Sequence, residues 1–115
     1  MPRQLPSYLR TLRLENGLSV TELAQLLGLS VSAVSRFEIL ARRPSIDVVF
    51  GTEVIFGTPP REAFPALFGE VEDEVMARAK MLFHRLERRS DLSSTDKRAF
   101  LLDMIRRLED PRFDL

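Results

Sequence analysis

Few side chains in this sequence of 115 residues have a type and spacing that could do covalent chemistry. His84 is the only histidine and there is no cysteine, so the usual nitrogen and sulfur ligands of a metal site cannot be assembled. The carboxylates between Glu70 and Glu74 could suggest a cation site, but the start of a helix attracts carboxylates without any metal. No phosphate-cradling glycine loop, nucleophile elbow or paired catalytic set is present. We therefore expect no enzyme activity, no cofactor and no metal site.

The most informative segment is residues 22–38, ELAQLLGLSVSAVSRFE, which contains two short helical patterns close together. The first pattern, rich in leucine, ends at Gly28, and the second begins behind Ser30, a residue type that caps helices. Val34 and Phe37 lie three apart and therefore share one face of the second helix. This arrangement leaves four residues on a face without an obvious packing partner: Val31, Ser32, Ser35 and Arg36.

Two short helices joined by a three-residue turn that contains glycine form a helix-turn-helix arrangement. The second helix can project into the major groove of DNA only if the two helices are braced at a steep angle. Ala24 is small enough for a close crossing, and Gly28 accepts the positive φ that the turn requires. Val34 is placed to lock the second helix onto the first. The residue types therefore suit each position of this arrangement.

Residues 17–38, together with the Pro-Ser and Phe-Gly pairs at 44–45 and 56–57, closely resemble the phage repressor and Cro class of helix-turn-helix regulators, often called the XRE family. The resemblance covers more than half of the chain. It implies a sequence-specific DNA-binding transcriptional regulator whose partner is double-stranded DNA. It also implies a buried ion pair between Arg13 and Glu38, because both positions that form this pair in the family are occupied here.

The resemblance further implies which residues contact DNA. It makes residues 31–38 the base-contacting helix, in which Arg36 would donate to a guanine and Val31 would meet a thymine methyl group. The amino ends of the second and fourth helices would offer N–H groups to phosphates, and two arginines after residue 38 would act as phosphate clamps. The implied base contacts are Val31, Ser32, Ser35 and Arg36, and the implied phosphate contacts are Ser19, Val20, Thr21, Arg42, Arg43 and Ser45.

Three positions depart from the family pattern. Val20 stands where many members carry a glutamine that helps to hold the recognition helix against the DNA backbone. Leu40 stands where a glycine is usual, so we expect residues 39–41 to extend the helix. Glu53 stands where alanine is common, at a position that faces the core.

The sequence as a whole predicts an all-α protein, because no strand-like alternation of any length occurs. We expect a five-helix, repressor-like helix-turn-helix domain over residues 1–68, followed by a two-helix hairpin over residues 69–115. The fifth helix is expected to end near residue 68. The sixth helix is expected to begin at the carboxylates between Glu70 and Glu74 and to end at Arg85, Arg88 and Arg89. This order of charges complements the helix dipole. Ser93 and Asp96 are expected to cap the seventh helix.

The two C-terminal helices carry more apolar surface than a short hairpin can easily hide. Regulators of this kind read paired half-sites on DNA, so we expect this segment to form a homodimer. Two alternatives stay open: a plain extension of the monomer core, and an antitoxin-like module that binds a protein partner through residues 69–115. The residues expected at the dimer interface are Met76, Phe83, Ile105 and Leu108.

Charge and hydropathy set further limits. The chain has 17 basic and 17 acidic residues, so its net charge is zero. A basic surplus is the usual mark of nucleic-acid binding, and DNA binding here would therefore depend on a few placed arginines. No apolar run approaches the roughly 18 residues of a membrane span, and the start of the chain lacks the apolar core of a signal peptide. We expect a cytoplasmic protein without a membrane partner.

Overall fold

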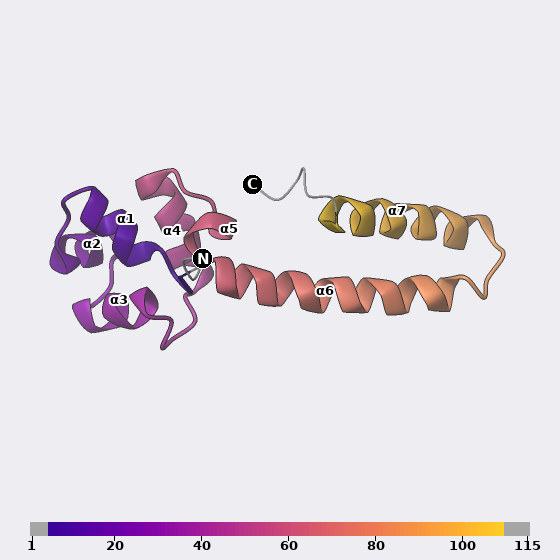
Figure 1. The fold of residues 1–115 in the computed structure, drawn as a ribbon, viewed down its shortest axis with the longest axis horizontal. Helices are drawn as coiled ribbons and strands as arrows, with labels where there is room; N and C mark the ends of the chain where they lie inside the picture. Colours follow the sequence, from indigo (N-terminus) through magenta and orange to yellow (C-terminus); the bar gives the residue numbers. More distant parts are fainter. Residues whose placement is uncertain (1–4, 110–115) are drawn as a thin grey trace. The chain divides into compact units, whose positions relative to one another are not determined.

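The computed structural model describes residues 5–109, and in this part of the chain all regular secondary structure is helical (Figure 1). The predicted all-α class is therefore confirmed. None of the helices described is long and apolar enough to cross a membrane. The described residues fall into two compact units that divide after Glu70. The helices are α1 (Leu9–Glu15), α2 (Val20–Leu27), α3 (Val31–Glu38), α4 (Ile46–Phe56), α5 (Pro60–Ala63), α6 (Pro65–Leu86) and α7 (Leu92–Glu109).

Serine side chains fix where three helices of the first unit begin. Ser19, Ser30 and Ser45 precede α2, α3 and α4, and each hydroxyl accepts a hydrogen bond from the backbone N–H three residues further on. At α2 the cap is reciprocal, because the Ser19 N–H donates to the Glu22 carboxylate at 2.8 Å. This donation holds the pKa of Glu22 below its usual value. The caps satisfy N–H groups that the first turn of a helix cannot pair internally.

Three helices of this unit end in one motif, with a single residue in the left-handed conformation. That residue is Gly17 after α1 (φ 70°), Gly28 after α2 (φ 69°) and Leu40 after α3 (φ 53°). In each case the next N–H donates to the carbonyl five residues earlier, which closes the helix end. The expectation that residues 39–41 extend α3 is therefore wrong, because the left-handed Leu40 turns the chain out of the helix.

The first unit has one core, to which all five of its helices contribute. The Tyr8 N–H donates to the Ala63 carbonyl at 2.8 Å and ties the start of α1 to α5. On α4 the expectation that Glu53 faces the core is wrong, because Glu53 is exposed and the neighbouring Thr52 is buried instead. The Thr52 hydroxyl is satisfied by donating to the Val48 carbonyl at 2.8 Å. The buried apolar residues are Leu9, Leu23, Ala24, Ala33, Val34, Phe37, Val48, Ala63 and Phe64.

The boundary between α5 and α6 differs from the expected one. α5 ends at Ala63, and α6 begins at Pro65 and continues without a break to Leu86. Proline favours the first turn of a helix because no partner is needed there for the N–H that it lacks. Gly69, where the sequence suggested a domain boundary, therefore lies inside a helix. The acidic cluster that follows also lies inside α6 and not at its start.

The second unit is a hairpin formed by the later part of α6 and by α7. Asp91 caps α7, because its carboxylate accepts hydrogen bonds from the Ser94 hydroxyl at 2.8 Å and from the Ser94 N–H at 3.1 Å. These two bonds hold the pKa of Asp91 below its usual value, and the bond from the Ser94 hydroxyl has the larger effect. The expected cap by Ser93 and Asp96 is therefore wrong: the helix begins one residue before Ser93, and Asp91 caps it.

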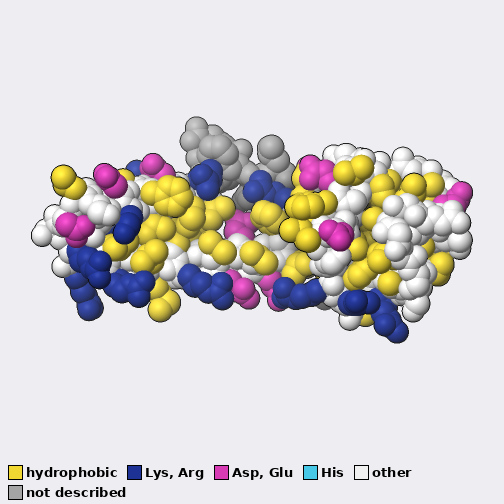
Figure 2. Space-filling model, turned by 180° about the vertical axis from the view of Figure 1, so that it is seen from behind, with side chains coloured by type: hydrophobic (Ala, Val, Ile, Leu, Met, Phe, Trp, Pro, Cys, Tyr) yellow, Lys and Arg dark blue, Asp and Glu magenta, His cyan; other side chains and the backbone are white. Residues whose placement is uncertain are grey.

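The hairpin has a small core of its own. Ala79, Leu86 and Leu101 are buried, and four half-buried side chains pack against them, including Phe83 and Ile105. Phe83 and Ile105, which were expected at a dimer interface, therefore pack inside the hairpin of their own chain. Met76 and Leu108, the other two residues expected at that interface, are half-buried. Figure 2 shows further hydrophobic side chains gathered on the surface of the hairpin, with Lys and Arg beside them. The exposed ones in this unit are Val71, Val75, Met81, Leu92 and Phe100.

We predict that Leu40→Gly leaves the protein more stable than Leu40→Ala. Both changes remove a side chain that packs against the core, but only glycine also removes the steric cost of the left-handed conformation. We expect a difference of about 1 kcal/mol in the free energy of unfolding, measured by urea titration. Ile39 is the matched control, because it is exposed and its φ is −102°, so alanine should be the more stable choice there. The same order at both positions would show that Leu40 is not strained.

Candidate nucleic-acid interface

α2 and α3 are held against each other by small and branched apolar side chains. Ala24 on α2 is 3% exposed and Val34 on α3 is fully buried. Gly28 supplies the left-handed turn between the two helices. α4 packs closely on α2, because a Cβ added at Gly51 would come within 2.8 Å of the Leu27 side chain. The buried side of α3 thus packs against α2, which is itself held by α4.

The outer side of α3 carries the residues that the sequence singled out. Ala33, Val34 and Phe37 are buried, and the helical period turns the residues between them to the solvent. Within residues 5–109 the Arg36 guanidinium makes no hydrogen bond or ion pair, so all of its donors are available to a ligand. The exposed residues of this face are Val31, Ser32, Ser35 and Arg36, together with the apolar Ile39 that follows the helix.

The amino ends of α2 and α4 offer fewer free donors than expected. The Ser19 N–H is occupied by the Glu22 carboxylate, so Ser19 cannot give this group to a phosphate. The N–H groups of Val20 and Thr21 have no partner among the described residues and stay available. The Val20 side chain packs against the core, which an apolar residue can do and the family's glutamine would not. At α4 the Val48 N–H donates to the Ser45 hydroxyl and is not available to a phosphate, whereas the hydroxyl can still donate its own proton.

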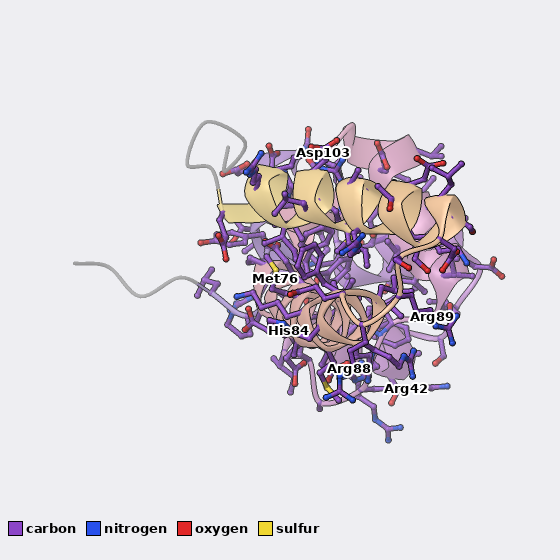
Figure 3. All side chains as sticks on the ribbon, turned by 90° about the vertical axis from the view of Figure 1, so that its right-hand side faces the viewer. Arg42, Met76, His84, Arg88, Arg89 and Asp103 are labelled. Carbon is purple, nitrogen blue, oxygen red and sulfur yellow. The ribbon has the colours of Figure 1, made fainter. Side chains whose placement is uncertain are left out.

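The two arginines after α3 lie in different surroundings. The Arg42 guanidinium stacks over the Phe37 ring, 5.5 Å from its centroid, and the side chain reaches the surface (Figure 3). Arg43 forms an ion pair with Glu70 at 3.3 Å, in which both side chains are mostly exposed. The sequence did not predict either contact, because Phe37 and Glu70 come close to these arginines only when the chain folds. Arg42 is therefore held beside α3, whereas Arg43 is paired with Glu70.

Arg13 and Glu38, which the family resemblance paired, are in contact. The Arg13 Nε donates to Glu38 Oε2 at 2.7 Å and the Nη2 donates to Oε1 at 3.3 Å, so the pair is bidentate. The side chains are only 11% and 6% exposed. The Arg13 Nη1 also donates to the Leu18 carbonyl at 3.0 Å, a contact that the sequence did not indicate. One guanidinium therefore fastens the end of α3 both to α1 and to the loop before α2.

The described part of the chain holds no cluster of metal-ligating side chains beside this face. Over residues 5–109 no three histidine or acidic side chains are grouped so that they could hold a metal ion. His84 lies on α6, where its ring nitrogen contacts the Glu87 carboxylate at 3.1 Å. The face around α3 is therefore built from hydrogen-bond donors and small apolar groups, which suits binding.

The chain is similar to known proteins. Residues 9–62 match the model of a family described as Helix-turn-helix. A protein of Pyrococcus furiosus named "Putative HTH-type transcriptional regulatory protein" is 40% identical over 89 residues. The match covers 70% of this chain and 27% of that relative, so the chain spans about a quarter of the relative's length. No solved structure matches the chain.

We predict that losing either partner of the Arg13–Glu38 pair costs about 3–5 kcal/mol of stability, because the remaining charge is left buried and unpaired. Suitable single changes are Arg13→Met and Glu38→Leu. The double variant should be more stable than either single variant, because two apolar side chains replace both charges. Denaturant titration of the four proteins gives the free energies. Single losses below about 1 kcal/mol would show that the pair behaves as a solvated surface pair.

Proposed function

Because residues 9–62 match the model of the helix-turn-helix family, we propose that this protein is a sequence-specific DNA-binding transcriptional regulator that inserts α3 into the major groove. The observation that carries the proposal is the division of α3 into two sides. One side is buried and braced by α2, while the other presents unsatisfied donors to the solvent. The name of the Pyrococcus furiosus relative supports the same function.

The proposed base contacts follow from the chemistry of the exposed face. The Arg36 guanidinium can donate two hydrogen bonds to O6 and N7 of one guanine. Ser32 and Ser35 can donate to or accept from base edges or phosphates, and Val31, which is 40% exposed, can meet a thymine methyl group. Arg36 is the residue to which we assign most of the sequence preference, because a bidentate contact discriminates best between bases.

The proposed phosphate contacts are shared between the backbone and the arginines. The free N–H groups of Val20 and Thr21 lie at the positive end of the α2 dipole, where an anion is favoured. Arg42 is kept near α3 by its stacking on Phe37. Arg43 can reach a phosphate only by leaving Glu70, so its contribution should be smaller than that of Arg42.

We further propose that the protein binds DNA as a homodimer. One short helix reads only a few base pairs, and regulators of this type gain affinity and specificity from two half-sites about one helical turn apart. The exposed apolar side chains of the hairpin provide surface for a second copy. Because the net charge is zero, a single copy would have little electrostatic attraction for DNA.

We predict that Arg36→Ala and Arg42→Ala have different effects on DNA binding. The affinity should be measured on a DNA site obtained by in vitro selection and on a scrambled control. Arg36→Ala should weaken the selected site by about 1–3 kcal/mol and relax the preference at one base pair, with little effect on scrambled DNA. Arg42→Ala should weaken binding to the selected and the scrambled DNA alike. It should also lower the slope of log affinity against log salt concentration by about one.

The matched control for both variants is Arg106→Ala, which removes the same charge from an exposed position on α7. It should leave both affinities nearly unchanged. If Arg36→Ala weakened selected and scrambled DNA equally, then Arg36 would not be the base-reading residue. If the wild-type protein selected no sequence at all, the proposed function would be wrong.

We predict that Glu70→Gln increases the affinity for all DNA sequences by a small factor, because it releases Arg43 from its ion pair. The pair is exposed and worth at most about 1 kcal/mol, so the gain should stay within about fivefold and shrink at high salt. The double variant Arg43→Ala/Glu70→Gln should bind no better than Arg43→Ala alone. A gain in the double variant would show that Glu70 repels DNA directly and does not act through Arg43.

A further inference from the structure

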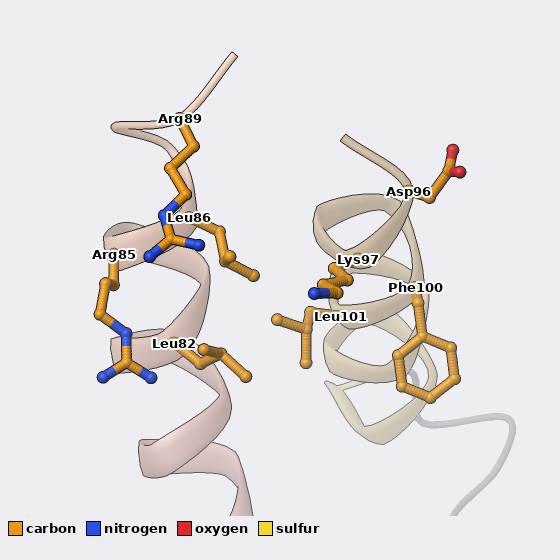
Figure 4. Close-up of a pocket in the computed structure, with 8 residues that line it drawn as sticks. All are labelled: Leu82, Arg85, Leu86, Arg89, Asp96, Lys97, Phe100 and Leu101. Atoms are coloured by element: carbon orange, nitrogen blue, oxygen red, sulfur yellow. The ribbon is translucent and has the colours of Figure 1, made fainter. Parts of the chain in front are cut away.

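A groove between α6 and α7 is apolar at its floor and basic at its rim (Figure 4). Leu82 and Leu86 of α6 point toward Leu101 of α7, and Phe100 of α7 also lines the groove. Phe100 is 68% exposed, an unusual position for a large aromatic ring, and within residues 5–109 it makes no ring or cation–π contact. Arg85, Arg89 and Lys97 border the groove, with Asp96 at its end. Its chemistry fits an amphipathic segment that carries apolar and acidic side chains.

The acidic cluster of α6 has such a composition, and the helix dipole does not account for it. A carboxylate gains from the dipole only within the first turn of a helix. Because α6 begins at Pro65, its first turn contains no acidic residue, and the cluster lies further inside. Val71 and Val75, on either side of Glu72, Asp73 and Glu74, are 46% and 41% exposed, and the Glu74 carboxylate lies 3.9 Å from the Arg78 guanidinium in an exposed ion pair. The segment from Val71 to Val75 is therefore apolar, acidic and, apart from the half-buried Glu72, exposed.

We propose that the groove of one copy holds residues 71–75 of a second copy, with the two α6 helices antiparallel. In this register Glu74 of each copy lies opposite Arg85 of the other. Val71 and Val75 then reach the apolar floor beside Phe100. A two-fold axis repeats every contact, so the arrangement closes as a dimer and leaves no end for further growth.

The spacing of exposed residues along α6 supports this pairing. Val71, Arg78 and Arg85 are seven residues apart, and Glu74, Met81 and Arg88 follow the same interval. A seven-residue interval keeps side chains on one strip of a helix that packs against another helix. The strip carries its one acidic residue, Glu74, near its beginning and ends with Arg85 and Arg88. An antiparallel copy sets each Glu74 opposite an Arg85 and sets Arg78 opposite the uncharged Met81, whereas a parallel copy in register would set Glu74 against Glu74 and each arginine against its own copy.

The experiment uses the full chain without DNA and measures its mass by sedimentation at several micromolar concentrations. The wild type should be a dimer. Phe100→Asp should weaken the dimer by at least about tenfold, because it replaces the apolar ring on which Val71 and Val75 of the second copy pack with a carboxylate that must lose its hydration. The residue is mostly exposed, so the helical circular dichroism should not change. Asp103→Lys is the control, because Asp103 lies on the side of α7 away from α6 and should not affect the dimer (Figure 3).

Charge exchange gives the more specific measurement. Glu74→Arg and Arg85→Glu should each yield a monomer, because each sets two like charges against each other across the interface. An equimolar mixture of the two variants should recover the dimer, because both contacts then join opposite charges again. Only an intermolecular contact between these two positions gives this result.

This inference rests on the homodimer in the proposed function and is independent of DNA binding. A dimer that resists Phe100→Asp and both charge reversals would overturn the groove and leave the homodimer intact. Single variants that are monomeric but do not recover on mixing would overturn the antiparallel register. A monomeric wild type would overturn both the groove and the homodimer, and the groove would then fit an acidic segment of another protein. None of these three results would affect the selection of DNA by α3.

Discussion

The bidentate contact between Arg13 and Glu38 is the constraint on which the placement of α3 depends. Glu38 is the last residue of α3, and its carboxylate is fixed by an arginine that also holds the Leu18 carbonyl. The three attached segments are α1, the loop before α2 and the end of α3. Hydrophobic packing around Val34 could allow small rotations of α3, but a bidentate charge pair has one preferred geometry. The orientation of the outer face is therefore set by polar bonds inside the domain.

Much of the first unit could be predicted from the sequence because its helix limits are encoded locally. Ser30 and Ser45 identify helix starts through side-chain bonds that need no tertiary contact, and Gly28 identifies an end through its φ. The errors occurred where packing overrides the local pattern. Leu40 takes a conformation typical of glycine, since its side chain packs against the core and the closing hydrogen bonds of α3 are satisfied there. Proline favours the first turn of a helix, so Pro65 was a start signal for α6, but the acidic cluster favoured a later start.

The candidate site was predictable to the extent that helical periodicity decides it. The positions of Val31, Ser32, Ser35 and Arg36 follow from the burial of Val34 and Phe37 on the same helix. The surroundings of Arg42 and Arg43 do not follow from periodicity, because Phe37 and Glu70 meet them only in the folded chain. The same limit applies to the hairpin. Its apolar residues were visible in the sequence, but the structure was needed to separate the buried Leu101 from the exposed Phe100.

The amino end of α2 has a consequence for how such a protein would find its site. The phosphate-binding groups proposed there are uncharged N–H donors at Val20 and Thr21, which act only at contact distance, whereas lysines and arginines attract phosphates over about a Debye length. Sliding along DNA depends on that longer-range attraction. With zero net charge, the protein should leave non-target DNA quickly and search mainly by repeated encounters from solution. Bulk chromosomal DNA would then sequester few copies, and occupancy of a target would follow the free protein concentration closely.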